Sequence, residues 1–258
     1  MIRVVKTIRA IIRILGRLLL LAAVLAVLAA LALAFLRWRG LILMPHEADP
    51  EEWQVFGVDV STYQGQIDWP VLAEQGVDFA FIKASEGSGL RDVRFTENWA
   101  GAQAAGIRPG AYHFFSYDSP GEGQAENFIA AVPVTPGAQP PVVDIEFYGP
   151  YLEEPAGAEQ VKASLDPLLE RLEECYGVKP ILYATYRSWQ LYLSGREYRD
   201  YPLWISSPVV APMLHDWDFW QYSHTARLEG YDGHQPLIDL NVFRGSREEF
   251  CSFGMPGA

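Results

Sequence analysis

The chain has 258 residues and a net charge of −12, and that charge is unevenly distributed. The first 40 residues hold seven basic and no acidic side chains, so residues 41–258 carry a net charge of −19. This acidic body, residues 41–258, argues against a nucleic-acid partner, because neutralising phosphates requires clustered Lys and Arg.

An uninterrupted apolar run fills residues 18–36 (LLLLAAVLAVLAALALAFL). As a helix it would extend about 28 Å, close to the hydrocarbon thickness of a bilayer. A cleaved signal peptide is the alternative, but its apolar region is normally about 7–15 residues long. Five basic residues precede the run and two follow it, which predicts a cytoplasmic N-terminus. We therefore predict a cytoplasmic basic segment (1–17), a transmembrane anchor (18–36) and a linker (37–55), in a single-pass protein of the cell membrane with an extracytoplasmic body (56–258).

In the body, short apolar runs alternate with stretches of helical character. Asp68 is a suitable cap for the first helical stretch, and Gly76 ends it. The predicted helices are 69–75, 96–105, 123–131, 158–175 and 187–193. The predicted strands are 56–60, 79–84, 107–115, 141–145, 180–184, 203–205, 219–222 and 238–242.

This alternation indicates an α/β fold with a mostly parallel sheet, since parallel strands need helical crossovers. Eight strands favour an irregular TIM-like barrel with reduced helices, regular at first and less so later. An open doubly wound sheet is the alternative. No glycine-rich G-x-G-x-x-G motif follows the first strand, so nucleotide binding has no support.

Carboxylates fall near the ends of several predicted strands, where parallel barrels place their chemistry. Asp144 and Glu146 are two residues apart and so face the same side of a strand, about 7 Å apart at Cα. Two anions that close repel each other, so one keeps its proton to higher pH. A protonated acid beside an ionised one is what glycoside cleavage needs. The alternative is a solvated D-x-E at a strand end, a pattern that is common by chance.

Aromatic side chains follow the same predicted rim. Flat rings offer apolar faces on which sugars stack, although each ring taken singly is more typical of a core position. The rings near the rim are those of Tyr112, Tyr183, Trp204, Trp220 and Tyr222.

The remaining reactive residue types give weaker signals. His113 lies in an apolar run, which favours a hydrogen-bonded core histidine over a base or metal ligand. Lys83 and Glu86 fit an active-site pair or a structural ion pair equally well. Cys175 and Cys251 fit either one disulfide or two buried thiols. No metal-ligand spacing occurs, so we predict neither a metal nor a cofactor.

A series of short motifs then appears in a characteristic order. They are Gly57-Val58-Asp59-Val60-Ser61 with Gln64-Gly65 and Ile67-Asp68-Trp69, Phe81-Ile82-Lys83-Ala84 with Glu86-Gly87, Gly110-Ala111-Tyr112-His113-Phe114, Gln124-Ala125 with Phe128, Asp144-Ile145-Glu146, Trp220-Gln221-Tyr222, and Asp239-Leu240-Asn241. The body that carries them resembles the glycoside hydrolase family 25 muramidases, the Chalaropsis-type lysozymes.

The resemblance implies a distorted β/α barrel that hydrolyses the β-1,4 bond between N-acetylmuramic acid and N-acetylglucosamine in peptidoglycan. By position, Glu146 resembles the proton donor, Asp144 its ionised partner, and Asp59 and Asp239 the family's other two site acids. Weaker candidates for sugar binding are Tyr112, Tyr183, Trp204 and Gln221. We expect a monomer. Two alternatives stay open: a non-catalytic peptidoglycan-binding protein on the same fold, and a hydrolase of another N-acetylhexosamine polymer.

Overall fold

The computed structural model describes residues 2–38, 52–208, 211–214 and 216–256. The chain divides into two compact units, Met1–Met44 and Pro45–Ala258. Most of the predicted linker therefore lies outside the described residues. The two units are considered separately.

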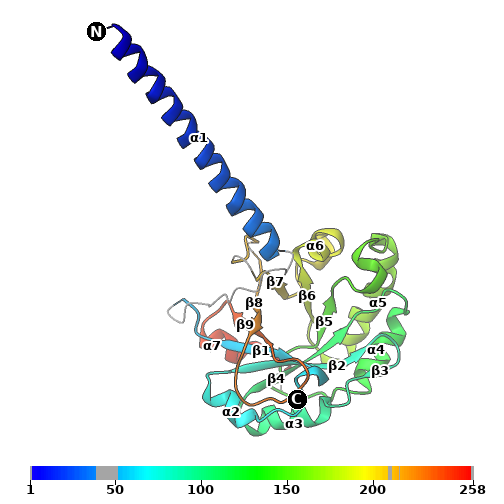
Figure 1. Cartoon of the computed structure of the whole chain (residues 1–258). Helices are drawn as coiled ribbons and strands as arrows, with labels where there is room; N and C mark the ends of the chain where they lie inside the picture. Colours follow the sequence, from blue (N-terminus) through cyan, green and yellow to red (C-terminus); the bar gives the residue numbers. More distant parts are fainter. Residues whose placement is uncertain (1, 39–51, 209–210, 215, 257–258) are drawn as a thin grey trace. The chain divides into compact units, whose positions relative to one another are not determined.

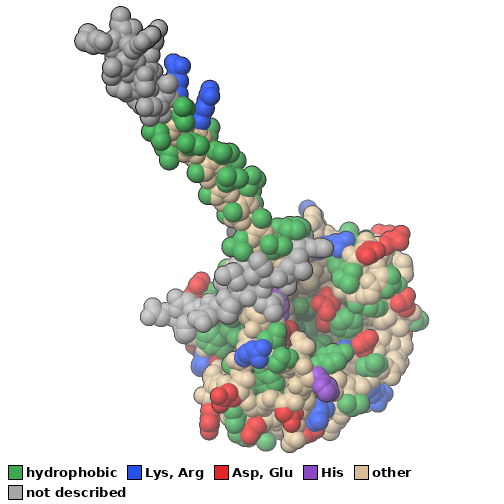
Figure 2. Space-filling view, in the orientation of Figure 1, with side chains coloured by type: hydrophobic (Ala, Val, Ile, Leu, Met, Phe, Trp, Pro, Cys, Tyr) green, Lys and Arg blue, Asp and Glu red, His purple; other side chains and the backbone are tan. Residues whose placement is uncertain are grey.

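The first unit is one long helix, α1 (Ile2–Trp38). Its segment Arg13–Leu36 is 24 residues long, has a mean hydropathy of 3.0 and has no buried part. Such a segment extends about 36 Å, enough to cross a bilayer. Figure 2 shows hydrophobic side chains along the visible face of this helix, with basic side chains toward its N-terminal end. A secretion signal has the same properties of length and composition.

The second unit is a closed barrel (Figure 1). Its strands form a sheet in the order β1-β9-β8-β7-β6-β5-β4-β2-β3, and pairing of β1 with β2 closes the ring. All eight predicted strands are confirmed, and β3 is an additional short strand that pairs only with β2. The strand bounds are β1 Phe56–Val60, β2 Phe79–Glu86, β3 Leu90–Arg91, β4 Arg108–Phe114, β5 Val142–Ile145, β6 Ile181–Thr185, β7 Leu203–Ser206, β8 Phe219–Ala226 and β9 Ile238–Phe243.

Strand β9 differs from the rest of the ring because it runs antiparallel to both of its neighbours, β8 and β1. The other neighbouring pairs in the ring are parallel. The eleven residues 227–237 that connect β8 to β9 contain no helix. A parallel return needs a longer crossover, so this connection gives an antiparallel strand. The start of β9 therefore lies at the same rim as the carboxyl ends of the other strands.

The helices confirm the expected weakening along the chain. Regular crossovers come first: α2 Trp69–Glu74, α3 Phe95–Ala104, α4 Gly121–Ile129 and α5 Ala158–Tyr176. As predicted, the Asp68 carboxylate caps α2 by accepting the Val71 N–H. Between β6 and β7 there are short turns in place of a regular helix: α6 Tyr186–Ser188, a π-helical turn Trp189–Leu193 and a 3-10 turn Arg196–Tyr198. A terminal helix, α7 (Arg247–Ser252), has no counterpart among the predicted helices.

Aromatic rings fill the barrel interior below the functional rim. The Phe81 ring of β2 lies 4.4 Å from Trp204 of β7 and 5.1 Å from Phe219 of β8, so these rings meet across the barrel. Phe250 of α7 packs 5.5 Å from Phe79 and fills the opposite end. A close-packed interior resists rearrangement. The side chains above it therefore stand on a rigid floor.

Candidate active site

The eight predicted site residues all line one cavity of about 200 Å³ at the carboxyl ends of the parallel strands. Its complete lining is Asp59, Ser61, Tyr63, Lys83, Tyr112, Phe114, Asp144, Glu146, Tyr183, Trp204, Gln221 and Asp239. Four carboxylates converge here from three strands, β1, β5 and β9. Convergence of like charges in a cleft is typical of a catalytic site rather than of a structural one.

Strand geometry brings the four acids together. Asp144 lies in β5 and Glu146 directly follows it, so the two face the same side, as predicted. Asp59 near the end of β1 pairs in register with Asp239 near the start of β9. Asp239 reaches the rim because β9 is antiparallel, which the sequence analysis did not anticipate.

The carboxyl groups of the inner pair, Asp144 and Glu146, do not both lose their protons readily. Burial raises the pKa of Glu146 to about 7, and the charge of Asp59 adds to the rise. Burial and the charge of Glu146 raise the pKa of Asp144 well above its usual range. Asp144 is only 7 % exposed, and its Oδ1 accepts no hydrogen bond from the described residues. We expected Asp144 to be ionised and Glu146 protonated, but the pKa values of both are raised.

The outer pair, Asp59 and Asp239, is held by amide side chains. Gln221 Nε2 donates to Oδ2 of Asp59 (3.0 Å) and to Oδ2 of Asp239 (3.2 Å). Its Oε1 accepts the hydroxyls of Tyr183 (3.0 Å) and Ser206 (2.8 Å). All four hydrogen-bonding positions of this amide are therefore in use. Gln221 thus holds the outer acids in place, and the sugar-binding role expected for it stays a prediction.

Among the described residues, Lys83 is the one cationic side chain that lines the cavity, and it forms an ion pair with Glu86 at 2.7 Å. The pairing of β2 with β4 shifts register between Lys83 and Ser85. This bulge turns two residues three positions apart toward the same side. The positive charge of Lys83 opposes the rise in pKa of both Asp144 and Glu146. Lys83 thus combines the two roles considered for it.

The aromatic residues predicted at the rim fall into two groups, because successive side chains of a strand point to opposite faces of the sheet. Trp204 (2 % exposed) and Tyr183 form the cavity floor, with ring centroids 4.5 Å apart. Trp220 and Tyr222 instead pack outside the barrel in a separate apolar cluster, and the Trp220 indole donates to the Ser207 carbonyl at 2.9 Å. The prediction that Trp220 and Tyr222 lie at the rim is therefore wrong. The side chains of Phe219 and Gln221 point inward from β8 instead.

Two functional residues were missed individually, Tyr63 and Asn241. Tyr63 stands on a 3-10 turn (Thr62–Gln64) directly after β1, and it is 63 % exposed while lining the cavity. Ser61 and Gln64 form a capping box that fixes this turn. Asn241 is fully buried in β9 and donates to Asp59 Oδ2 at 2.8 Å. Asn241 belongs to the quoted motif Asp239-Leu240-Asn241, so its position there was the available signal, whereas Tyr63 lies between two quoted motifs and had none.

His113 lies outside the cavity, on the face of β4 that packs against α4. Its Nδ1 lies 2.8 Å from Ser85 Oγ and its Nε2 3.0 Å from Gln124 Oε1. Burial lowers the pKa of His113 to about 4, so the ring is neutral. This is the expected core histidine. The two cysteines form no disulfide, and Cys175 is half-buried while Cys251 is exposed.

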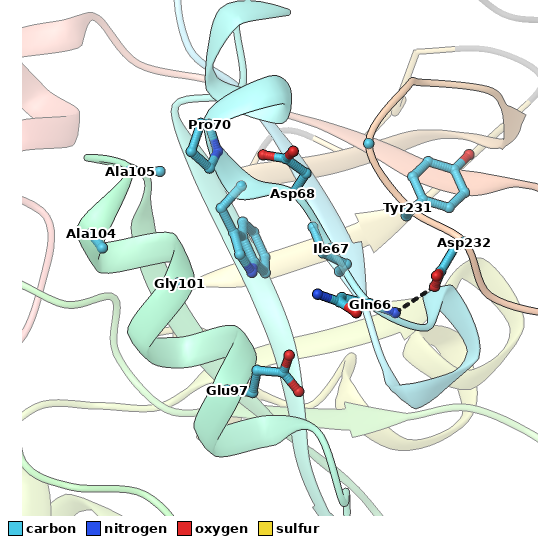
Figure 3. A pocket seen from close by; sticks show the side chains of 12 residues that line it. Gln66, Ile67, Asp68, Pro70, Glu97, Gly101, Ala104, Ala105, Tyr231 and Asp232 are labelled. Atoms are coloured by element: carbon cyan, nitrogen blue, oxygen red, sulfur yellow. Dashed lines mark hydrogen bonds between the residues drawn. The ribbon is translucent and has the colours of Figure 1, made fainter.

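A larger groove, of about 700 Å³, lies between residues 66–70, helix α3 and residues 230–232 (Figure 3). Its three carboxylates each have a structural partner: Asp68 accepts the Val71 N–H (3.4 Å), Glu97 an Arg94 N–H (2.9 Å) and Asp232 the Gln66 N–H (2.8 Å). We therefore place the chemistry in the smaller cavity, where the acids face one another. No cluster of His, Cys, Asp and Glu in the described part of the chain has a geometry suited to a metal ion.

Fold and cavity together define a barrel protein of the glycoside hydrolase class, with a rim of paired carboxylates. The sequence model of glycosyl hydrolases family 25 matches residues 58–231. The chain belongs to this family.

Relatives and solved structures agree with this membership. Lysozyme M1 of Streptomyces globisporus is 33 % identical over 211 residues, covering 74 % of this chain and 68 % of the relative. A family 25 glycosyl hydrolase from Bacillus anthracis superposes with a TM-score of 0.75 at 47 % identity, covering 81 % and 97 % of the two chains. A bacterial lysozyme from Streptomyces coelicolor gives 0.69 at 30 % identity, covering 78 % and 96 %.

Proposed function

We propose that this chain is a peptidoglycan muramidase in which Glu146 is the proton donor and Asp144 its charged partner. It would hydrolyse the β-1,4 bond between N-acetylmuramic acid and N-acetylglucosamine. The single observation that supports this best is the convergence of Asp59, Asp144, Glu146 and Asp239 on one cavity. Family 25 membership and the similarity to lysozyme M1 support the choice of substrate.

In this proposal Glu146 gives its proton to the glycosidic oxygen, and the bond from that oxygen to the anomeric carbon breaks. The sugar ring becomes cationic, and a cation beside Asp144 lowers the pKa of that carboxyl. Asp144 therefore ionises where its charge is needed, although burial raises its pKa. Water then adds to the anomeric carbon and returns its proton to Glu146.

The covalent step has two routes. Asp144 can attack the anomeric carbon itself, or it can steady the substrate's own N-acetyl group while that group attacks. The buried Oδ1 of Asp144 is suited to either route, because it accepts no hydrogen bond from the described side chains. Both routes need an ionised Asp144 at the transition state.

Digestion of purified peptidoglycan tests the proposal. We expect new reducing ends from the wild-type chain. Retained binding to peptidoglycan without turnover would indicate a non-catalytic binding protein, and turnover of chitin but not of peptidoglycan would indicate a different N-acetylhexosamine polymer.

We also propose that residues 18–36 of α1 anchor the enzyme in the cell membrane, with 1–17 in the cytoplasm and the barrel (56–258) outside, where its substrate is. The apolar length of α1 and the excess of basic residues before residue 18 support this orientation. The full-length chain should then stay with membranes after an alkaline wash. Recovery of a soluble barrel that lacks α1 would instead indicate a cleaved signal.

Replacing Tyr63 with Ala should raise KM about fivefold with little change in kcat, because a stacked ring contributes about 1 kcal/mol to sugar binding. Thermal stability should not change, since the Tyr63 ring is exposed and its turn is fixed by the capping box of Ser61 and Gln64. Steady-state kinetics on soluble glycan strands measure both constants. Tyr63→Phe is the control and should behave like the wild type. A wild-type KM for Tyr63→Ala would remove Tyr63 from the binding site.

A further inference from the structure

Asn241 connects the catalytic rim to the barrel floor. It is fully buried, and both ends of its amide are hydrogen-bonded. Its Nδ2 donates to Asp59 Oδ2 at 2.8 Å, and its Oδ1 accepts the indole N–H of Trp204 at 2.8 Å. A buried amide with both ends satisfied specifies one arrangement of its neighbours.

The indole fixes which way this amide faces. A tryptophan side chain can only donate a hydrogen bond, so the oxygen of Asn241 must face Trp204 and its NH₂ group must face Asp59. Gln221 is oriented by the acids instead: its NH₂ group donates to the carboxylates of Asp59 and Asp239, and its oxygen accepts the hydroxyls of Tyr183 and Ser206. The indole below the cavity thus sets the direction of the Asn241 amide.

The two amides donate more hydrogen bonds to Asp59 than to Asp239. Asp59 Oδ2 accepts two N–H groups, from Asn241 and Gln221, whereas Asp239 accepts only the longer bond from Gln221. Hydrogen bonds to a carboxylate favour its ionised form. The remaining hydrogen bond of the pair joins the two acids themselves, and it favours the anion at Asp59 and the proton at Asp239.

We propose that Asn241, oriented by Trp204, is a positioning residue that fixes the negative charge of the Asp59–Asp239 pair on Asp59. This inference rests on the proposed muramidase function. It gives a reason why the charge of the outer pair lies on Asp59 and not on Asp239. The charge placed there acts on Glu146, because the Asp59 anion helps Glu146 retain its proton. Asn241 does not touch the reacting atoms in this account.

The titratable groups that line the cavity with Asp59 come from the turn after β1, from four other barrel strands and from the end of β5. They are Tyr63 on the turn, Lys83 on β2, Tyr112 on β4, Asp144 and Glu146 at β5, Tyr183 on β6 and Asp239 on β9. Among the described residues that line the cavity, Lys83 is the one cation. Burial raises the pKa of Asp59, and the hydrogen bonds from Asn241, Gln221 and Asp239 oppose that rise.

The test is the pH dependence of kcat on soluble glycan strands, measured for the full-length chain in detergent. Asn241→Leu removes the donor at similar volume, and we expect the acidic limb of the profile to move up by about one pH unit. The limb near pH 7 that belongs to Glu146 should move down by less, because a smaller share of the pair's charge then lies on Asp59. Trp204→Phe keeps an aromatic ring but frees the amide, so it should give a smaller shift in the same direction.

Asn98→Leu is the matched control, because Asn98 is equally buried but lies in α3, away from the cavity. It should leave the acidic limb in place. An equal loss of kcat at every pH in both Asn241→Leu and Trp204→Phe would overturn the inference and leave these residues a structural role. If Asn241→Leu does not fold, Trp204→Phe decides alone. A wild-type chain without activity would instead count against the proposed function itself.

Discussion

Replacing Glu146 with Gln should lower kcat on peptidoglycan by about a thousandfold and leave KM nearly unchanged. Glutamine has the same shape and can still form hydrogen bonds, but it has no proton to give to the leaving oxygen. General acid catalysis typically contributes about 10²–10⁴ in rate. The release of reducing ends from peptidoglycan by purified variants measures the effect.

Glu159→Gln is the matched control, since Glu159 is exposed in the first turn of α5. It should retain full activity and the same unfolding temperature. Folding of the Glu146 variant can be checked by circular dichroism, because loss of one half-buried carboxylate should not destabilise the barrel. A Glu146→Gln enzyme that keeps more than about a tenth of the wild-type rate would remove Glu146 from the role of acid.

Replacing Asp144 with Asn should also lower kcat severely, by about a hundredfold to a thousandfold. The substitution keeps the size of the side chain and removes the negative charge that opposes the cationic sugar ring. The loss is expected on either covalent route, because both need an anion at this position. Steady-state kinetics should show the effect in kcat and not only in KM.

Asp200→Asn provides the control for this substitution, because Asp200 is 87 % exposed and lies 3.8 Å from Lys179 on the surface. It should behave like the wild type. If Asp144→Asn raised KM alone, Asp144 would bind substrate without stabilising the transition state. Asp144 and Glu146 would then not act together as a catalytic pair.

Much of the fold could be predicted because it depends on local patterns. Each parallel strand is a short apolar run between a helix end and a rim, so strands such as Val142–Ile145 stand out in the sequence. Helix signals such as Asp68 and Gly177 are local too, and Gly177 ends α5 in the left-handed conformation with φ 68°. The π-helical turn at Trp189–Leu193 has no such signal.

The direction of β9 could not be predicted, because a strand has the same alternation whichever way it runs. The sequence nevertheless placed Asp239 among the site acids, through its resemblance to a family motif and not through its position on a strand. The errors at Trp220 and Tyr222 arose because proximity in sequence to the rim does not decide which side of β8 a ring faces.

Within the site, the four acids were predictable and their supporting contacts were not. Asp144 and Glu146 follow from a two-residue spacing on one strand. The hydrogen bond between Trp204 of β7 and Asn241 of β9 joins two residues that are 37 positions apart in the chain. Only the closed ring brings these side chains together, so hydrogen bonds of this kind lie beyond a one-dimensional pattern.

The central claim is that a neutral acid and a charged partner share one cavity, and the pH profile of kcat/KM tests it most directly. Glu146 must be protonated to act, and its pKa is raised to about 7. Activity should therefore fall as the pH rises through about 7, and it should fall again in acid as the partner carboxylates are protonated. A bell-shaped profile with its basic limb near neutrality is the predicted result. A rate that stays constant from about pH 4 to about pH 9 would contradict the claim.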